Sequence, residues 1–222
     1  MSATAVVTLP PTPTAPTLGM TPPPVPAKPF YLTMSTLRRF TLAEYHRMIE
    51  TGVLIGGEPY ELLEGWIVRK MSRGNPHDSA ITALNKRLVR MLPAGWDVRC
   101  QCAATLSDDS EPEPDFALVR GDERTFRDYH PGPAEIGLLV EVSDSSLTVD
   151  RHDKGRIYAR DGIAVYWVVN VVDRQIEVYT QPGGPAGAPA YQNRHDFPPG
   201  TVIPVVLDDQ KVGVIAVSDV LG

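Results

Sequence analysis

The sequence lacks the marks of membrane, secreted and disulfide-bonded proteins. No apolar run approaches the roughly 18 residues that a spanning helix needs, so we expect no membrane association. No Lys or Arg precedes Lys28 and no compact apolar stretch follows the first residues, which argues against a secretory leader. Cys100 and Cys102 are the only cysteines, and their spacing is too short for an ordinary disulfide. These absences favour a reduced, cytoplasmic protein.

Positive charge is also scarce. The 222 residues include 21 Lys and Arg against 27 Asp and Glu, which gives a net charge of −6. This balance excludes a protein that coats nucleic acid through bulk basicity, although it is compatible with a local basic groove. The hydrophobic fraction of 42% is ordinary for a globular protein.

Proline is unevenly distributed along the chain. Residues 1–29 hold nine of the 22 prolines, together with several threonines and one charged residue. Such a segment cannot bury enough apolar surface to offset its chain entropy. We therefore expect a disordered Pro/Thr-rich tail over residues 1–29 and a folded domain over residues 30–222.

The remaining pattern predicts a mixed α/β domain. Helices are expected at 42–51, 75–92 and 149–160, and hairpins at 60–63/66–68 and 164–172/175–180. Extended segments are expected at 96–106, 115–120 and 136–142, a Gly/Pro-rich loop at 182–200, and closing strands at 202–207 and 211–217. The almost unbroken apolar run at 136–142 is typical of a buried central strand.

Two acidic residues stand beside apolar strands. Asp115 opens one predicted strand and Glu141 ends the next, where an ionised carboxylate is costly unless a cation or hydrogen-bond donors meet it. If the strands are neighbours, the two carboxylates can converge on a hard divalent ion such as Mg²⁺. Lys154 lies on the following helix and can there orient the attacking water and offset phosphate charge.

Several short motifs occur in a fixed order along the chain. They are Tyr60–Gly65, Pro76-His77, Pro114-Asp115, Val140–Ser143, Asp150–Lys154, Tyr158–Ile163 and Tyr166–Val169. Each is weak alone, but the set and its order resemble the Uma2 family, also called DUF820, of the PD-(D/E)XK nuclease superfamily. The resemblance covers roughly residues 38–220.

The resemblance implies a restriction-endonuclease-like core, with a mixed central β-sheet flanked by helices. It also implies a metal-dependent DNA endonuclease that uses Mg²⁺ or Mn²⁺ to hydrolyse phosphodiester bonds. Asp115 and Glu141 would be metal ligands, the backbone carbonyl of Val142 a third, and Glu61 would complete or tune the site. Together with Lys154, these acids would form the catalytic set.

The chain departs from the superfamily signature at one position. The signature places a lysine two residues after Glu141, where this chain has Ser143. In relatives of the family the lysine has moved to the following helix, and Lys154 occupies that place here.

The helix at 75–92 carries a candidate substrate-binding strip. His77, at its start, matches a family position, and helix N-termini favour anions such as phosphate. Lys86 and Arg90 can contact phosphates, or they can form an ordinary solvated face. DNA is the expected substrate, and a homodimer would suit double-strand cleavage.

Two alternatives remain open at this point. The chain can be a catalytically inactive nuclease-fold module that binds nucleic acid or a protein partner, because fold does not guarantee activity. It can also be a glycoside hydrolase with paired carboxylates, which would need neither Lys154 nor a metal.

Overall fold

The computed structural model describes residues 34–55, 57–183 and 188–222. The chain divides into two compact units, residues 1–38 and 39–222. The described part of the first unit holds one short 3-10 turn, η1 (Met34–Thr36). The predicted tail over residues 1–29 lies outside the described residues, so the domain boundary at residue 30 stays a prediction. All other described elements belong to the second unit.

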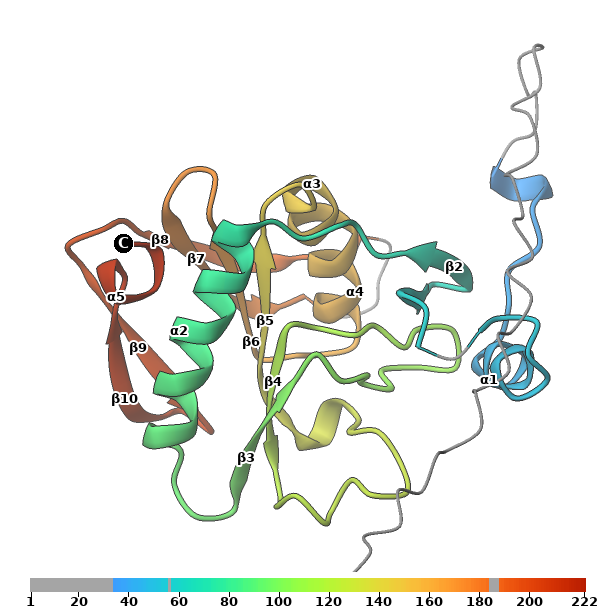
Figure 1. Cartoon of the computed structure of the whole chain (residues 1–222), viewed down its shortest axis with the longest axis horizontal. Helices are drawn as coiled ribbons and strands as arrows, with labels where there is room; N and C mark the ends of the chain where they lie inside the picture. The colour runs from blue at the N-terminus through green and yellow to red at the C-terminus, as the bar shows by residue number, and fades with distance from the viewer. Residues whose placement is uncertain (1–33, 56, 184–187) are drawn as a thin grey trace, which may run out of the picture. The chain divides into compact units, whose positions relative to one another are not determined.

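A six-stranded sheet forms the centre of the second unit (Figure 1). In spatial order its strands are β3 (Trp96–Cys100), β4 (Phe116–Arg120), β5 (Ile136–Ser143), β6 (Val165–Asn170), β7 (Gln175–Pro182) and β8 (Tyr191–Phe197). β5 and β6 run parallel and the other neighbours antiparallel, so the sheet is mixed, as predicted. All eight residues of β5 are buried, which confirms the apolar run as a central strand.

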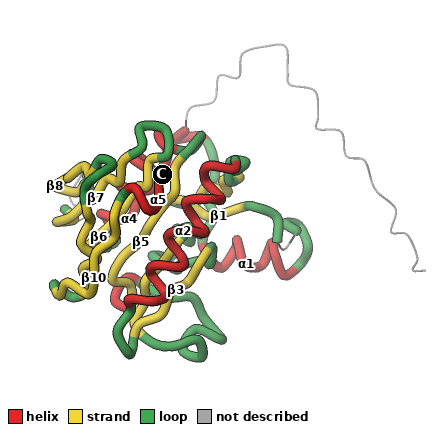
Figure 2. The backbone as a smooth tube through the Cα atoms, turned by 60° about the vertical axis from the view of Figure 1, so that its left-hand side comes forward, coloured by secondary structure: helices red, strands yellow, loops and turns green. Residues whose placement is uncertain are grey.

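One face of the sheet is covered by the longest described helix, α2 (Asn75–Met91), as Figure 2 shows. Ala80, Leu84 and Leu88 of α2 pack onto the alternate residues of β5 that begin with Leu138. The hairpin and short helix that complete this layer are β9 (Val202–Leu207), β10 (Gln210–Ala216) and α5 (Ser218–Leu221).

The other face is covered by the helical segment that follows β5. It contains α3 (Leu147–Val149), the π-helix η3 (Asp150–Lys154) and α4 (Gly155–Arg160). Ile157 and Tyr158 pack there against Leu139 of β5 and Val168 of β6. Because side chains alternate along a strand, Glu141 points to this face while Val140 and Val142 point to α2.

A helix and a hairpin precede α2, as predicted. α1 (Leu42–Glu50) begins at a capping box, in which Thr41 Oγ1 accepts from the Glu44 N–H and a Glu44 carboxylate oxygen accepts from the Thr41 N–H. β1 (Tyr60–Leu63) and β2 (Trp66–Arg69) form an antiparallel hairpin. Its turn residues Glu64 and Gly65 have φ of 48° and 78°, which the two-residue turn requires. A 3-10 turn, η2 (Pro133–Glu135), leads into β5.

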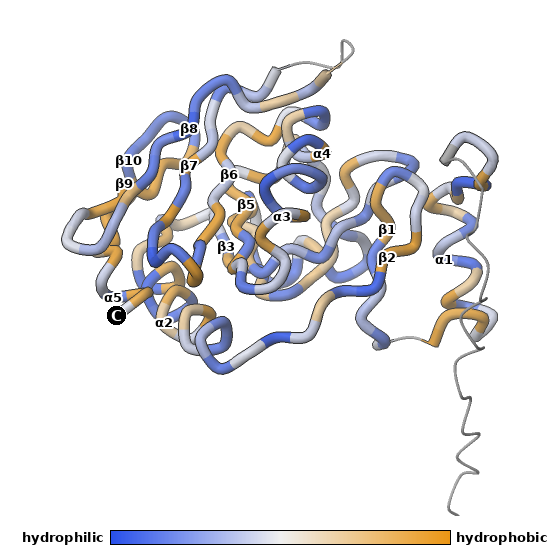
Figure 3. Tube along the Cα trace, turned by 90° about the horizontal axis from the view of Figure 1, so that it is seen from above, coloured by the Kyte–Doolittle hydropathy of each residue, from blue (hydrophilic) through white to orange (hydrophobic). Residues whose placement is uncertain are grey.

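Two predicted segments were wrong. The strand expected at 96–106 ends at Cys100, because Gln101 adopts a left-handed φ of 53°. The loop expected at 182–200 contains β8, whose residues are mostly exposed and polar and which forms through main-chain pairing with β7 at the sheet edge. Figure 3 shows this contrast between hydrophilic β8 and the hydrophobic centre of β5 and β6.

No helix in the described ranges is long and apolar enough to cross a bilayer. The α2 helix, with 17 residues, has an exposed polar side that includes Lys86 and Arg90.

Candidate active site

Asp115 and Glu141 face each other across neighbouring strands. Phe116 of β4 pairs with Val140 of β5, so the antiparallel register brings Asp115, directly before β4, beside Glu141. The N–H of Val142 donates to Asp115 Oδ2 at 2.9 Å. The strand pairing itself therefore holds the two carboxylates on one face of the sheet.

Lys154 reaches the same place from η3. Its Nζ lies 3.0 Å from Glu141 Oε1 and 3.0 Å from Glu61 Oε2. The Tyr158 hydroxyl, one turn further on, donates to the same Glu141 oxygen at 2.6 Å. Single π-turns within helices often occur at functional sites, and this one carries the lysine where a regular helix was predicted.

Glu61 comes from β1, outside the central sheet. Its Oε2 also accepts the N–H of Glu113 at 3.2 Å, which fixes the carboxylate against the segment that leads to β4. The exposed fractions of Glu61, Glu141 and Lys154 are each 4%. Charges this well buried require partners, and here the acids have one ammonium between them.

His77 closes the other side of Asp115. It lies in the first turn of α2, and its Nε2 is 3.2 Å from Asp115 Oδ2. Gln101 Nε2 donates to Asp115 Oδ1 at 3.3 Å. Asp115 is thus fixed by contacts from α2, from β5 and from Gln101, the residue that follows β3.

The burial of this cluster changes its protonation equilibria. Burial raises the pKa of Glu141 to about 8, against the lowering effect of the Lys154 ammonium. Burial alone would lower the pKa of Lys154, but the carboxylates of Glu141 and Glu61 raise it above its usual value. Lys154 is therefore an ammonium at neutral pH.

Asp115 and His77 shift in opposite directions. Burial opposes ionisation of Asp115, but the hydrogen bonds from His77 and from the Val142 N–H hold its pKa below the usual range. Burial disfavours the charged form of His77, but the Asp115 carboxylate raises its pKa, while the charge of Arg73 acts in the lowering direction. A cationic His77 beside an ionised Asp115 is the form that this pairing favours.

The cluster lines a small cavity of about 80 Å³. Room of this size suits several water molecules or a partly hydrated ion. The cavity is lined by Glu61, His77, Asp115, Glu141, Val142, Asp150, Lys154 and the cations Arg69, Lys70 and Arg73, among others. Asp150 adds a further buried acid, whose Oδ2 accepts from the Ser143 hydroxyl at 2.7 Å.

The described residues contain no group of three or more His, Cys, Asp or Glu side chains arranged to hold a metal. A magnesium site with two carboxylates and a backbone carbonyl does not require one, because Mg²⁺ usually keeps several waters. Lys154 Nζ and the Tyr158 hydroxyl both donate to Glu141 Oε1, which leaves Glu141 Oε2 to meet a cation. Glu61, Asp115, Glu141 and Asp150 are buried acids that supply carboxylate oxygens, the ligands that a hard divalent cation prefers, so the residues present fit such a cation.

The structure gathers most of the residues that the sequence singled out. Glu61, His77, Asp115, Glu141, Val142 and Lys154 all line the one cavity. Lys86 and Arg90 do not line it, because they lie on the exposed part of α2. At 1.5 Å per residue, Lys86 is about 14 Å further along the helix than His77.

Sequence reasoning missed the basic segment 69–73, which runs from the last residue of β2 towards α2. Arg69, Lys70 and Arg73 line the cavity with the predicted acids. Three cations within five residues of an acidic chain are a visible signal, but their position beside Asp115 and Glu141 depends on tertiary structure.

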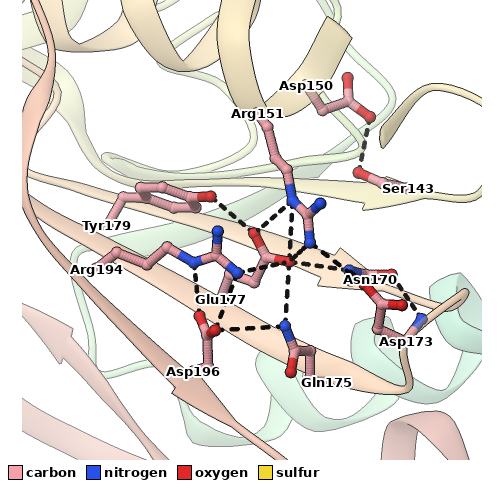
Figure 4. Close-up of polar contacts among 10 residues, drawn as sticks. All are labelled: Ser143, Asp150, Arg151, Asn170, Asp173, Gln175, Glu177, Tyr179, Arg194 and Asp196. Carbon is pink, nitrogen blue, oxygen red and sulfur yellow. Dashed lines mark hydrogen bonds and ion pairs between the residues drawn. The ribbon is translucent and has the colours of Figure 1, made fainter. Parts of the chain in front are cut away.

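Another acid, Glu177 of β7, is fully buried outside the cavity, where it contacts Arg151 of η3 (Figure 4). Arg151 Nε donates to its Oε2 at 3.0 Å, Asn170 Nδ2 to its Oε1 at 2.9 Å and the Tyr179 hydroxyl to its Oε2 at 2.7 Å. Arg194 Nη2 lies 3.3 Å from Oε1. Burial would raise its pKa, but these hydrogen bonds lower the pKa of Glu177 to about 2.

A solved structure has a similar fold. It is described as a "putative nuclease belonging to DUF820" from Anabaena variabilis, with 17% sequence identity and a TM-score of 0.59. The similarity covers 82% of this chain and 97% of that chain. The chain therefore shares the fold of that protein, as the sequence motifs implied.

The family follows from the sequence itself. The profile of the Uma2 family, described as "Putative restriction endonuclease", matches residues 42–211. The chain belongs to the Uma2 family, which confirms the resemblance. No curated protein sequence matches the chain significantly.

Proposed function

We propose that this chain is a metal-dependent DNA endonuclease that hydrolyses phosphodiester bonds at the Asp115–Glu141–Lys154 cavity. The observation that carries the proposal is the convergence of these three charged side chains, from three different elements, in one cavity. The family description and the nuclease-like fold support the same reaction class.

The proposed metal ligands are Asp115, Glu141 and the backbone carbonyl of Val142, with Glu61 able to complete the set. Mg²⁺ or Mn²⁺, when bound, would acidify water and offset charge on the phosphate oxygens. Asp115 is held for this task by His77 and by the Val142 N–H, so its carboxylate needs little rearrangement.

Lys154 is proposed to orient the attacking water and to stabilise the phosphate. An ammonium has three hydrogens to donate. Two of these hydrogens face acids among the described residues, because Nζ lies 3.0 Å from Glu61 Oε2 and 3.0 Å from Glu141 Oε1. The third remains for a water molecule or a phosphate oxygen in the cavity.

The substrate, assembly and location are also proposals. We take DNA as the substrate because the family description names a restriction endonuclease. A homodimer would supply the two sites that double-strand cleavage needs. A cytoplasmic location is consistent with the free thiols of Cys100 and Cys102.

The test is cleavage of supercoiled plasmid and of labelled oligonucleotides by the full chain in Mg²⁺ or Mn²⁺. Asp115→Ala, Glu141→Ala and Lys154→Ala should each remove cleavage, and a chelator should remove it from the wild type. Glu123→Ala, at an exposed acid, is the matched control and should cleave like the wild type.

Cleavage that survives in the three variants would contradict the site. Absence of cleavage by every folded variant and by the wild type, with both metals, would favour an inactive module that binds nucleic acid or a protein. Cleavage of glycosidic substrates that resists the chelator would favour the glycoside hydrolase.

A further inference from the structure

Arg69 ends β2, and Arg73 lies in the segment that leads from β2 to α2. Both arginines are exposed, and within the described ranges neither guanidinium group forms an ion pair or a hydrogen bond. Other arginines are paired with acids, for example Arg156 with Glu64 and Arg151 with Glu177. The position of these two guanidinium groups beside the cavity distinguishes them from other exposed cations such as Lys86 and Arg90.

The backbone of this segment is nevertheless fixed. Lys70, between the two arginines, donates from Nζ to the Glu113 carbonyl at 2.7 Å and lies 3.2 Å from the Glu113 carboxylate. Its N–H also donates to the carbonyl of Pro59 at 2.7 Å. The segment therefore presents Arg69 and Arg73 from an anchored backbone, which lowers the entropy cost of binding a ligand.

The two arginines connect the catalytic cavity with the open surface. Arg69 and Arg73 line the cavity of Asp115, Glu141 and Lys154. They also line an adjoining surface pocket of about 630 Å³, together with Pro59, Lys70, Met71 and Ser72. Figure 3 shows the stretch of chain between β2 and α2 as largely hydrophilic.

The acidic groups near Arg69 and Arg73 do not neutralise the charge of these arginines. Asp144 lines the cavity close to Gly74, at the start of α2, and Asp78 is exposed in the first turn of that helix. Neither forms an ion pair with Arg73 among the described residues. An anionic ligand would thus meet Arg69 and Arg73 directly on its way to the cavity.

We propose that Arg69 and Arg73 bind backbone phosphates of the DNA strand whose scissile bond enters the cavity. This inference rests on the proposed nuclease function and assigns it a substrate-positioning surface. Residues four apart span at most about 14 Å of chain, which corresponds to about four base-pair rises of 3.4 Å on one strand. Two successive contacts on one strand are therefore within reach.

The phosphate surface differs from the one expected on α2. Lys86 and Arg90 are also exposed cations, but they lie away from the cavity. Since phosphate contacts position a nucleic acid, cations at the cavity mouth fix the scissile bond and distant ones do not. The two pairs of cations offer a matched comparison.

The test measures binding of a fluorescent 30-base-pair duplex in Ca²⁺ by anisotropy, over a series of KCl concentrations. Arg69→Gln/Arg73→Gln should reduce the slope of log K against log salt by about 2, one for each lost contact. At about 0.1 M salt its affinity should fall roughly 60-fold. Lys86→Gln/Arg90→Gln should stay within about twofold, and all proteins should melt alike because neither pair touches the core.

An unchanged slope in Arg69→Gln/Arg73→Gln would overturn the inference, as would an equal loss in both double variants or no binding by the wild type. The proposed function fails separately. If the wild type binds through Arg69 and Arg73 but cleaves nothing in Mg²⁺ or Mn²⁺, the phosphate surface stands and the nuclease does not. If Arg69→Gln/Arg73→Gln cleaves with unchanged KM, the nuclease stands and the phosphate surface does not.

Discussion

Glu141 and Glu177 lie in the same cross-strand row of the sheet but have opposite surroundings. Glu141 pairs with Val168 on β6, and Val168 pairs with Glu177 on β7. Glu141 shares one ammonium with Glu61, whereas Glu177 meets the guanidinium groups of Arg151 and Arg194 as well as neutral donors.

The consequence is an opposite shift of pKa. Burial raises the pKa of Glu141 to about 8, and for Glu177 the hydrogen bonds overcome burial and lower it to about 2. Both side chains are buried, at 4% and 0% exposed, so burial alone does not distinguish a structural acid from a proposed metal ligand. The distinction lies in whether protein donors occupy both carboxylate oxygens, as at Glu177, or leave one oxygen for a ligand, as at Glu141.

The π-helix η3 serves both acids. It supplies Arg151 to Glu177 and Lys154 to Glu141 from a single turn. One short element therefore contacts both acids, but through different side chains.

The largest expected effect separates the two acids by activity. Glu141→Gln removes a proposed metal ligand and should lower cleavage about 10³-fold or more. The same change at Glu177 should leave cleavage per folded molecule within a few fold of the wild type, because Glu177 does not line the cavity. Single-turnover cleavage of a labelled duplex measures both, and equal losses would remove the comparison.

Lys154→Met tests the shared cation. It leaves Glu61 and Glu141 buried without an ammonium, which should cost about 3 kcal/mol of unfolding free energy. Cleavage should fall about 10²–10³-fold through loss of a donor to the phosphate. Urea unfolding at pH 8 measures the stability term, with Lys211→Met, at an exposed lysine, as the control. If Lys154→Met and this control have the same unfolding free energy, the buried acids do not need the lysine for their stability.

The smallest expected effect is the pH dependence that Glu177 contributes to stability. Its folded pKa of about 2 lies below the ordinary value of 4.5, so its contribution is present above about pH 4.5 and is lost as the pH falls toward 2. The stability difference between wild type and Glu177→Gln should be about 2 kcal/mol at neutral pH, because partly exposed arginines are screened by water.

That difference should disappear near pH 2. Chemical unfolding of both proteins from pH 7 to pH 2 measures it. Asp196→Asn, at a more exposed acid beside Arg194, provides the control for general charge effects. Parallel stability curves for wild type and Glu177→Gln would show that Glu177 has an ordinary pKa.

The sequence predicted most of the fold because its strands carry long apolar runs. Ile136–Ser143 is buried throughout, and apolar periodicity also identified α2. β8 lacked such a pattern, since Tyr191–Phe197 is held mainly by main-chain pairing to β7. The end of β3 depends on the left-handed φ of Gln101, which its residue type does not specify.

The site was predictable where a motif marked it. Asp115 and Glu141 adjoin apolar strands, and the structure brings them together. Glu177 had no such signal, because its partners Arg151 and Arg194 are 26 and 17 residues away in the sequence and meet it only in the folded chain.

The most direct test is a calorimetric titration of Mn²⁺ into the wild type, Glu141→Gln and Glu177→Gln. The account predicts that the wild type and Glu177→Gln bind Mn²⁺ alike and that Glu141→Gln loses this binding. Retained binding in Glu141→Gln, or its loss in a folded Glu177→Gln, would contradict the assignment of the metal to the Asp115–Glu141 cavity.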